Sequence, residues 1–148
     1  MIRLATQADR PVVEDTVHAA YSIYIDRIGK PPGPMLDDYA TLIDAGVVSV
    51  FEDANQNVLA IIVLLPKRDH LLFDNIAVRP DWQGQGLGRR LIAFAESEAR
   101  RLGYAEIRLY THQKMTENVA LYTRLGFVET GRGTEAGYDR VFMTKRLD

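Results

Sequence analysis

The sequence predicts a mixed α/β fold of the α+β type, with a single mixed sheet of about seven strands and about four helices. Short apolar runs and alternations mark the strands, and apolar residues at helical spacing mark the helices between them. One helix must connect two strands by a crossover, so part of the sheet is parallel. At 148 residues the chain has the length of one domain, expected to span residues 1–148.

The N-terminal part begins with a short strand over residues 2–4. Residues 6–9 offer helix caps, and Pro11 suits a first helical turn. Residues 29–35, rich in glycine and proline, end the helix, and a second short helix is expected over residues 37–45. Apolar side chains at helical spacing predict one long amphipathic first helix: Val13, Val17, Ala20, Tyr21, Tyr24 and Ile28.

Three strands are expected to follow as an antiparallel meander. Residues 47–51 are β-branched and apolar, and residues 54–57 have the composition of a hairpin turn. Residues 58–65 are almost continuously apolar, as expected for a strand buried on both faces. A turn over residues 66–69 leads into a strand over residues 70–78.

The next helix is predicted from Gly86 to Gly103, with Glu96 and Arg100 paired on its wet face. Residues 107–110 form a strand parallel to the one that ends at Val78, because a helix joins them. A short helix over residues 116–126 and two strands, 127–130 and 138–145, complete the chain. The apolar side chains that the long helix is expected to bury are Leu87, Leu91, Phe94, Ala95, Ala99 and Leu102.

Composition excludes several classes of function. The formal net charge of −2 lacks the basic field that nucleic-acid binding needs. The chain has no cysteine, and its three histidines are scattered, so neither a disulfide framework nor a metal site is expected. No apolar run reaches the length of a membrane span and no signal peptide is recognisable, so a soluble cytoplasmic protein is expected.

Residues 75–91 are the chemically most informative stretch. An apolar strand ends at Val78, and Gly84, Gly86 and Gly88 stand at the start of a helix. Glycine lets the main chain approach a ligand closely, and the first N–H groups of a helix attract an anion. The stretch therefore predicts a phosphate site built from main-chain N–H groups; the alternative is an ordinary glycine-rich turn.

The spacing of the loop can be compared with that of known phosphate-binding loops. Arg89 follows Gly88 where a P-loop has lysine, and the third glycine of a dinucleotide fingerprint is missing. The spacing Gln83-x-x-Gly86-x-Gly88 instead resembles the loop that binds the diphosphate of acetyl-coenzyme A in the GNAT superfamily of N-acetyltransferases.

A second motif extends this resemblance over essentially the whole chain. Members of the family carry an asparagine a few residues before a tyrosine and then Gly-Phe, found here as Asn118, Tyr122, Gly126 and Phe127. The resemblance implies the GNAT fold. It also implies an enzyme that transfers the acetyl group of acetyl-CoA to a primary amine by direct attack.

The resemblance assigns roles to particular residues. The loop would hold the diphosphate, the strand edge would bind the pantetheine arm as an added strand, and an N–H near Val78 would polarise the thioester carbonyl. Acetyl-CoA is the expected co-substrate, and no metal is expected. The cofactor-binding residues are Ile76, Ala77, Val78, Gln83, Gly84, Gln85, Gly86, Leu87, Gly88, Arg89, Asn118 and Tyr122.

Tyr122 is expected to protonate the departing thiolate. A free thiol has a pKa near 8.5 and a phenol near 10, so a phenol can share or deliver a proton to sulfur. The alternative is packing alone, in which a Schellman turn at Gly126 brings Tyr122 against Phe127. The two roles are compatible, because one ring can pack while its hydroxyl reaches the sulfur.

The general base is less well defined. Asp74 is the first candidate, through a water relay, and His112 is the second because its pKa suits the task. The alternatives are a turn or cap partner for Asp74 and a solvated loop position for His112. Several members of the family need no dedicated base.

The acceptor is expected to bind among Tyr24, Met35, Tyr39 and Tyr138, in a partly apolar, aromatic pocket. A small amine, an amino acid, an antibiotic and a protein lysine all remain open as acceptors.

Several charged residues have two interpretations. Asp37 and Asp38 either attract an amine or cap the second helix. Arg132 and Arg140 either bind an acidic acceptor or are surface residues of the strands. The helix arginines either contact the adenosine 3′-phosphate or face water: Arg89, Arg90 and Arg124.

The alternative function is an acyl-CoA-binding sensor without turnover, which needs the loop of residues 83–88 but not Tyr122. Dimers are common in the family, although nothing in the sequence fixes an interface.

Overall fold

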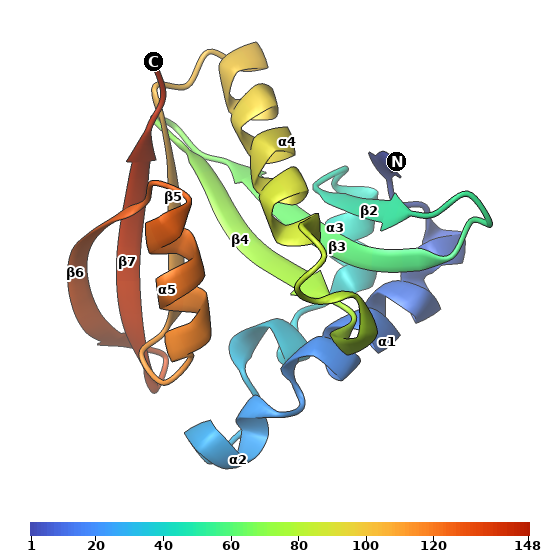
Figure 1. The fold of residues 1–148 in the computed structure, drawn as a ribbon, viewed down its shortest axis with the longest axis horizontal. Coiled ribbons are helices and arrows are strands. Elements are labelled where there is room, and N and C mark those ends of the chain that lie inside the picture. Colours follow the sequence, from blue (N-terminus) through green and yellow to red (C-terminus); the bar gives the residue numbers. More distant parts are fainter. The chain divides into compact units, whose positions relative to one another are not determined.

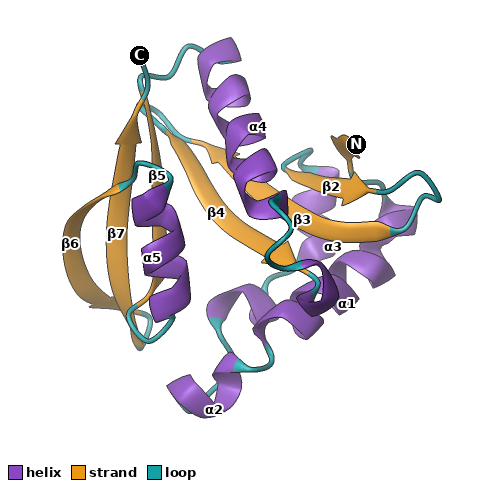
Figure 2. Cartoon of the chain, viewed as in Figure 1, coloured by secondary structure: helices purple, strands orange, loops and turns teal.

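A computed structural model describes residues 1–148 and confirms the predicted fold class (Figure 1). Its seven strands form one sheet in the order β1-β2-β3-β4-β5-β7-β6. Figure 2 shows the alternation of strands and helices along the chain. The elements are β1 (Ile2–Leu4), η1 (Gln7–Asp9), α1 (Arg10–Tyr21), α2 (Tyr24–Ile28), η2 (Gly33–Leu36), α3 (Tyr39–Asp44), β2 (Val48–Glu52), β3 (Val58–Pro66), β4 (Leu71–Val78), η3 (Pro80–Trp82), α4 (Leu87–Arg101), β5 (Glu106–His112), α5 (Thr116–Arg124), β6 (Val128–Glu135) and β7 (Tyr138–Arg146).

The chain forms two compact units. The first consists of Met1–Leu64 and Asn75–Leu91, and the second of Leu65–Asp74 and Ile92–Asp148. Strand β4 and helix α4 each begin in one unit and end in the other. None of the helices has the length and apolar character needed to cross a membrane.

Strands β1, β2 and β3 of the first unit pair antiparallel, as the apolar pattern predicted. Every residue from 58 to 63 is at most 7% exposed, which confirms that β3 is buried on both faces. Burial of each large aliphatic side chain, such as Ile61 and Ile62, contributes roughly 1.5–3 kcal/mol. In the β2–β3 hairpin the Asp53 carboxylate accepts hydrogen bonds from the N–H groups of Asn55 and Asn57, both at 2.9 Å.

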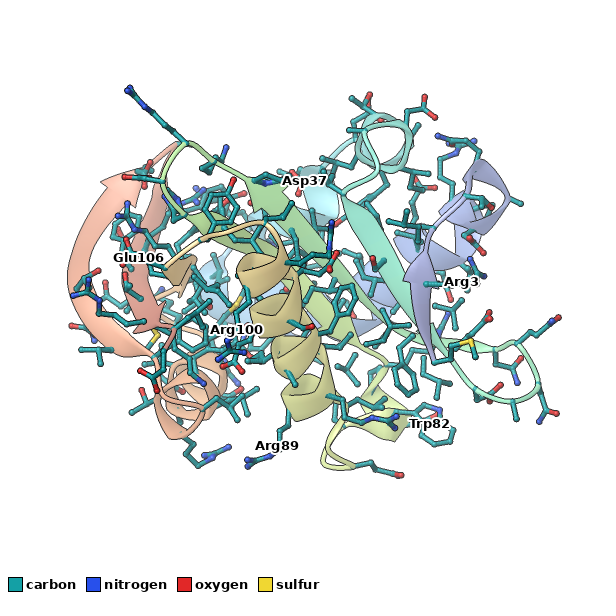
Figure 3. All side chains as sticks on the ribbon, turned by 90° about the horizontal axis from the view of Figure 1, so that it is seen from above. Arg3, Asp37, Trp82, Arg89, Arg100 and Glu106 are labelled. Carbon is teal, nitrogen blue, oxygen red and sulfur yellow. The ribbon has the colours of Figure 1, made fainter.

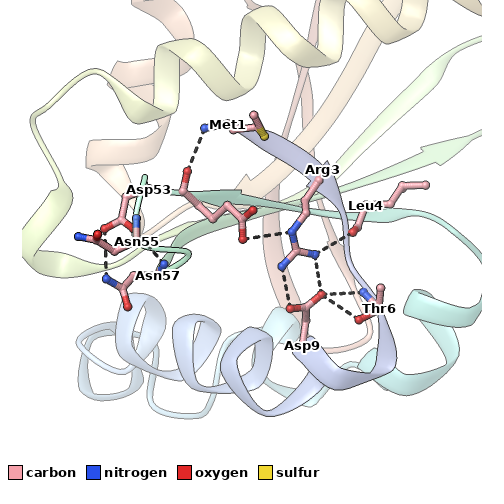
Figure 4. A network of polar contacts seen from close by, with 9 residues as sticks. Met1, Arg3, Leu4, Thr6, Asp9, Asp53, Asn55 and Asn57 are labelled. Carbon is pink, nitrogen blue, oxygen red and sulfur yellow. Dashed lines mark hydrogen bonds and ion pairs between the residues drawn. The ribbon is translucent and has the colours of Figure 1, made fainter.

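An ion-pair network fastens the N-terminal strand (Figure 4). The Arg3 guanidinium lies 2.8 Å from Asp9 and 3.1 Å from Glu52, and so joins β1 to the start of α1 and to β2. The hydrogen bond from Arg3 lowers the pKa of Asp9 to about 2. Asp9 also accepts the N–H of Thr6 at 2.7 Å, so the predicted caps at residues 6–9 are confirmed.

The predicted single helix through Ile28 is wrong, because the chain turns at Ser22 and Ile23 and forms α1 and α2 instead. The Ile25 N–H bonds to the Ser22 carbonyl, three residues back, which tightens the helix at this point. The apolar spacing did not reveal the turn, because a short tight turn barely changes which side chains face inward. This break gives five α-helices where about four were expected.

In the second unit, β7 pairs antiparallel with both β5 and β6. Strand β4 pairs with β5 in parallel, as predicted, over the positions Leu71↔Ile107 to Phe73↔Leu109. Along β5, Ile107, Leu109 and Thr111 are buried, and the residues between them are less so. Because successive side chains of a strand point to opposite faces, the sheet of this unit has one buried and one partly open face.

Two predictions about the surface of α4 are wrong. Glu96 does not pair with Arg100 on a wet face but forms an ion pair with Lys145 of β7, and Arg101 pairs with Glu98 at 2.8 Å. Leu102 is 44% exposed, because the helix has already ended at Arg101. Lys145 also donates to the Leu125 carbonyl at 2.7 Å, which satisfies a free carbonyl at the end of α5.

Candidate active site

The glycine loop has the conformation of a main-chain anion site. Gly84 and Gly86 have φ angles of +79° and +82°, in the left-handed region that favours glycine. A Cβ added at either position would meet no atom within 4 Å, so the need for glycine comes from the backbone conformation and not from packing. The loop from 83 to 86 is exposed, and space in front of it is open.

Helix α4 begins directly behind this loop. The Arg90 N–H bonds to the Gly86 carbonyl at 3.1 Å, which is the first bond of the helix. The N–H groups of Leu87, Gly88 and Arg89 therefore have no partner within the helix and are available to an anion. Figure 3 shows Arg89 pointing outward from this first turn.

The edge of β4 is only partly free. The Arg79 N–H bonds to the Leu59 carbonyl of β3 at 2.9 Å. Since successive peptide groups of a strand point to opposite sides, the N–H and C=O groups of Val78 and Ile76 point away from β3. Both carbonyls are occupied: the Tyr21 hydroxyl donates to Ile76 at 2.6 Å and the Gln83 amide to Val78 at 3.1 Å.

A buried polar network behind this strand escaped the sequence reasoning. Asn75 is 2% exposed; its Oδ1 lies 2.7 Å from the Tyr21 hydroxyl, which shares its one proton between Asn75 and the Ile76 carbonyl, and its Nδ2 donates to the Tyr39 hydroxyl at 2.9 Å. The Tyr39 hydroxyl in turn donates to the Pro34 carbonyl at 2.5 Å. The network ties α1, η2 and α3 to β4, and the only sequence sign of it was an asparagine inside an apolar strand.

Tyr39, expected to line an acceptor pocket, belongs to this network, and its role toward an acceptor stays a prediction. Its side chain is 2% exposed and its hydroxyl holds the loop of residues 29–35. Tyr24 is likewise buried, at 7% exposed, with the Arg27 guanidinium 5.0 Å from the centre of its ring. Met35 and Tyr138 are partly exposed, and Tyr138 packs edge-on against His112.

In the second unit the end of α5 has the geometry predicted for Tyr122. Gly126 has a φ angle of +97°, the Phe127 N–H bonds to the Tyr122 carbonyl at 3.0 Å, and the Gly126 N–H to the Thr123 carbonyl at 3.1 Å. These bonds define a Schellman turn. Tyr122 packs edge-on against Phe127 and Phe73, with ring centres 5.9 and 5.8 Å away.

One turn before Tyr122, the Asn118 amide lies 3.6 Å from the Met115 sulfur. A thioether is a weak acceptor, so this contact costs little to exchange for a stronger one. Asn118 is partly exposed, whereas Tyr122 is 4% exposed. The two side chains of the second motif therefore differ in access to solvent although they lie on one helix.

Asp74 lies one residue beyond the last β4–β5 pair. The Tyr110 hydroxyl donates to its carboxylate at 3.0 Å. Burial raises the pKa of Asp74, an effect partly offset by this hydrogen bond and by Lys67 and Arg140. A partly buried carboxylate with a raised pKa holds a proton more readily than an ordinary aspartate does.

His112 is less suited to act as a base. Its Nδ1 accepts the Lys114 N–H at 3.0 Å. A neutral imidazole has one acceptor nitrogen, so the proton of His112 must be on Nε2 and the lone pair of Nδ1 is already used.

The structure shows the contacts of most of the charged residues that had two interpretations. Asp38 caps α3, because its carboxylate accepts the Thr41 N–H at 3.2 Å and the Thr41 hydroxyl at 2.8 Å. The Arg90 guanidinium lies over the Phe51 ring at 4.8 Å, and Arg132 pairs with Glu129 at 3.0 Å. Arg89 and Arg124 are exposed.

The chain matches known proteins in sequence over part of its length. It is 41% identical over 61 residues to the [ribosomal protein bS18]-alanine N-acetyltransferase of Escherichia coli K12. The matched segment covers 41% of this chain and 41% of that protein. The chain is 34% identical over 85 residues to the L-amino acid N-acyltransferase MnaT of the same strain, which is 53% of this chain and 49% of that protein. The matches span less than half of these curated relatives.

Solved structures extend the likeness to the whole fold. The PaiA N-acetyltransferase of Thermoplasma acidophilum, solved in complex with coenzyme A, superposes with a TM-score of 0.82 at 16% identity, over 99% of this chain and 98% of that one. Such identity speaks for the fold alone. A family model described as the acetyltransferase (GNAT) domain matches residues 44–129, more than half of the chain. The chain therefore belongs to the GNAT acetyltransferase family, as its two motifs predicted.

Proposed function

We propose that the chain is an acetyl-CoA-dependent N-acetyltransferase that acts on a primary amine by direct attack. The observation that carries this is the main-chain site of the first unit, where left-handed glycines precede the free N–H groups of α4. A diphosphate needs several converging donors and a close approach to the backbone, and this loop fits both needs. The N–H groups of Ile76 and Val78 supply further donors for the pantetheine arm.

Acetyl-CoA, as a substrate, supplies the acetyl group as a thioester. The amine nitrogen bonds to the acetyl carbon, the carbon–sulfur bond breaks and the thiol leaves. Tyr122 gives its proton to the sulfur, Asn118 hydrogen-bonds the pantetheine, and an N–H near Val78 stabilises the developing oxyanion. The proton lost by the amine passes through water to Asp74, whose raised pKa suits that role.

Gln83 has a defined part in this proposal. Its amide occupies the Val78 carbonyl, which points away from β3 like the groups assigned to the pantetheine arm. Binding of that arm replaces this bond with one of its own, so the carbonyl stays satisfied before and after binding.

An amine acceptor is supported by the relatives, whose names state acyl transfer to the amine of a protein alanine or of an L-amino acid. We further propose that residues 1–148 act as one GNAT domain, because β4 and α4 are shared by both units. A single cooperative unfolding transition, with the same midpoint by near- and far-ultraviolet circular dichroism, would support this.

The experiment that tests the function combines two measurements on the full chain. Calorimetry measures the affinity for coenzyme A, and thiol release from acetyl-CoA is followed over a panel of amines. Binding together with amine-dependent release supports the enzyme. Tight binding without release on any amine would favour a sensor, and absence of binding would exclude both functions.

A further inference from the structure

The second unit contains a cavity of about 290 Å³ on the partly open face of its sheet. Tyr110 of β5, Arg140 and Phe142 of β7 and Thr130 of β6 are among the residues that line it. These side chains alternate with the buried residues of the same strands, so the face away from the unit's buried core forms the cavity.

Arg140 has no acidic partner, unlike Arg108 and Arg132 on the neighbouring strands. Arg108 lies 2.6 Å from Glu106, and Arg132 lies 3.0 Å from Glu129. The Arg140 guanidinium instead stacks on the Tyr110 ring, 3.9 Å from its centre, and its Nε is buried without a hydrogen-bond partner. A buried donor left unpaired is costly, and an anion placed against it would remove that cost.

A carboxylate is bound to the hydroxyl of the same tyrosine. The Tyr110 hydroxyl donates to Asp74 at 3.0 Å, while the face of its ring carries Arg140. One rigid side chain therefore holds a carboxylate at its hydroxyl and a guanidinium on its ring face. An amine near Asp74 and a carboxylate near Arg140 would each meet an opposite charge, which is the charge pattern of an amino acid.

The other charged groups around the cavity do not compete for an anion. Arg108 is neutralised by Glu106 and by Asp69, at 2.6 and 3.8 Å. His70 is held by Asp69 at 2.7 Å. Glu135, also in the lining, repels an anion from its own side and leaves the Arg140 side as the favourable position.

We infer that the acceptor is a free amino acid whose carboxylate binds Arg140, and that Arg140 sets this specificity. The inference rests on the proposed function, because it names the class of acceptor for that reaction. Arg140 acts here on binding alone, since the guanidinium contacts the carboxylate and not the reacting nitrogen. The Tyr110 ring holds the guanidinium in place, so little side-chain freedom is lost when the acceptor binds.

The test compares each amino acid of a panel with its own carboxamide, which keeps the amine and removes the negative charge. Thiol release from acetyl-CoA gives kcat/KM for both compounds with the wild type, Arg140→Gln and Arg140→Lys. We expect the wild type to favour the acid by roughly 10- to 100-fold, the value of a hydrogen-bonded charge. Arg140→Gln should lose that preference, so that its kcat/KM for the acid approaches its own kcat/KM for the amide.

Arg140→Lys should recover part of the preference, because it restores the positive charge without the fork of donors. The matched control is Arg132→Gln, which removes a strand arginine that already has a partner and should leave the ratio unchanged. Equal use of acid and amide by the wild type, or an unchanged ratio in Arg140→Gln, would overturn the inference.

Failure of the proposed function gives a different pattern. If no amine supports thiol release, the proposal that the chain is an N-acetyltransferase is rejected. Calorimetric titration of wild type and Arg140→Gln with the amino acids and their amides then decides the inference by itself. Loss of acid binding on substitution, with no binding of the amides, supports it, and equal binding by both proteins contradicts it.

Discussion

The two units of this molecule present their functional groups in different ways. In the first unit, the loop at residues 84–88 and the edge of β4 offer main-chain N–H groups, whose orientation depends on the backbone conformation. In the second unit, Tyr122, Asp74, Tyr110 and Arg140 offer side-chain groups on a strand-and-helix scaffold. A site built from main-chain groups and a site built from side chains should therefore respond differently to substitution.

This difference has a physical cause. A main-chain donor survives any side-chain substitution that keeps the backbone conformation, so only a change in φ or in the supporting network removes it. A side-chain group is lost by one substitution while the fold stays intact. Changes at Tyr122 should therefore act on rate and changes at Arg140 on acceptor binding, whereas changes in the first unit should act on coenzyme affinity and stability.

The largest effect is expected from Tyr122→Phe. The ring keeps its contacts with Phe73 and Phe127, so the fold should hold, while the proton donor is lost. We expect kcat to fall roughly 100-fold, a typical contribution of general acid catalysis, with a much smaller change in coenzyme A affinity. Steady-state kinetics and calorimetry measure the two quantities.

Tyr104→Phe is its control, because the Tyr104 hydroxyl donates to the Lys67 carbonyl away from the proposed chemistry. If Tyr122→Phe kept the wild-type kcat, Tyr122 would be a packing residue only.

The next effect is expected from Asn75→Ala in the first unit. The substitution deprives the buried hydroxyls of Tyr21 and Tyr39 of one partner each. The free energy of unfolding should fall by about 2 kcal/mol, within the range for a buried polar group left unpaired. Urea denaturation measures it, beside Asn55→Ala in the exposed hairpin, where about 0.5 kcal/mol or less is expected. Equal losses in the two variants would mean that the network does not stabilise β4.

A smaller effect is expected from Gly86→Ala, which places a side chain at a φ angle of +82°. The strain of about 1–2 kcal/mol should shift the loop and weaken coenzyme A binding about tenfold, with kcat at saturation kept. Gly131→Ala is the matched control, because Gly131 has no left-handed φ and an added Cβ there would also meet no atom within 4 Å. Coenzyme affinity equal to wild type in Gly86→Ala would argue against a main-chain site.

The smallest effect is expected from Asp74→Asn on the pH dependence of stability. Burial raises the pKa of Asp74 above its ordinary value of 3.8, so the folded state holds this proton more tightly than the unfolded chain. Its contribution to stability is full below pH 3.8 and is lost as the pH rises through the folded pKa. The variant, which keeps an oxygen for Tyr110, should gain stability relative to wild type between pH 3 and pH 7 in urea titrations. A constant difference would show that burial does not raise this pKa.

Much of the fold could be predicted because its patterns are local. The apolar run of β3, the crossover through α4 and the Schellman turn at Gly126 each depend on residues close together in the chain, and all three are confirmed. The turn at Ser22 was missed because a break of this kind leaves the apolar spacing intact.

In the candidate site too, features set by residues close together in the chain were predictable and contacts between distant residues were not. The glycine loop was predicted correctly as a strand-to-helix connection with special backbone angles, because glycine spacing reports directly on φ. The partners of Tyr39 were not predictable, since they lie 5 and 36 residues away along the chain. From the sequence, Arg132 and Arg140 were equal candidates to bind an acidic acceptor. In the folded sheet Arg132 pairs with Glu129, whereas the Arg140 Nε has no hydrogen-bond partner.

The sequence by itself determined the family, the order of the strands and the place of the glycine loop between β4 and α4, because these follow from spacing between near neighbours. Only the tertiary structure decided which polar side chains are already engaged: Asn75 with two tyrosines, Glu96 with Lys145, and Arg140 with an aromatic face but no acid. Whether a charged or polar group is satisfied depends on what the fold brings within about 3 Å of it, and no local pattern records that.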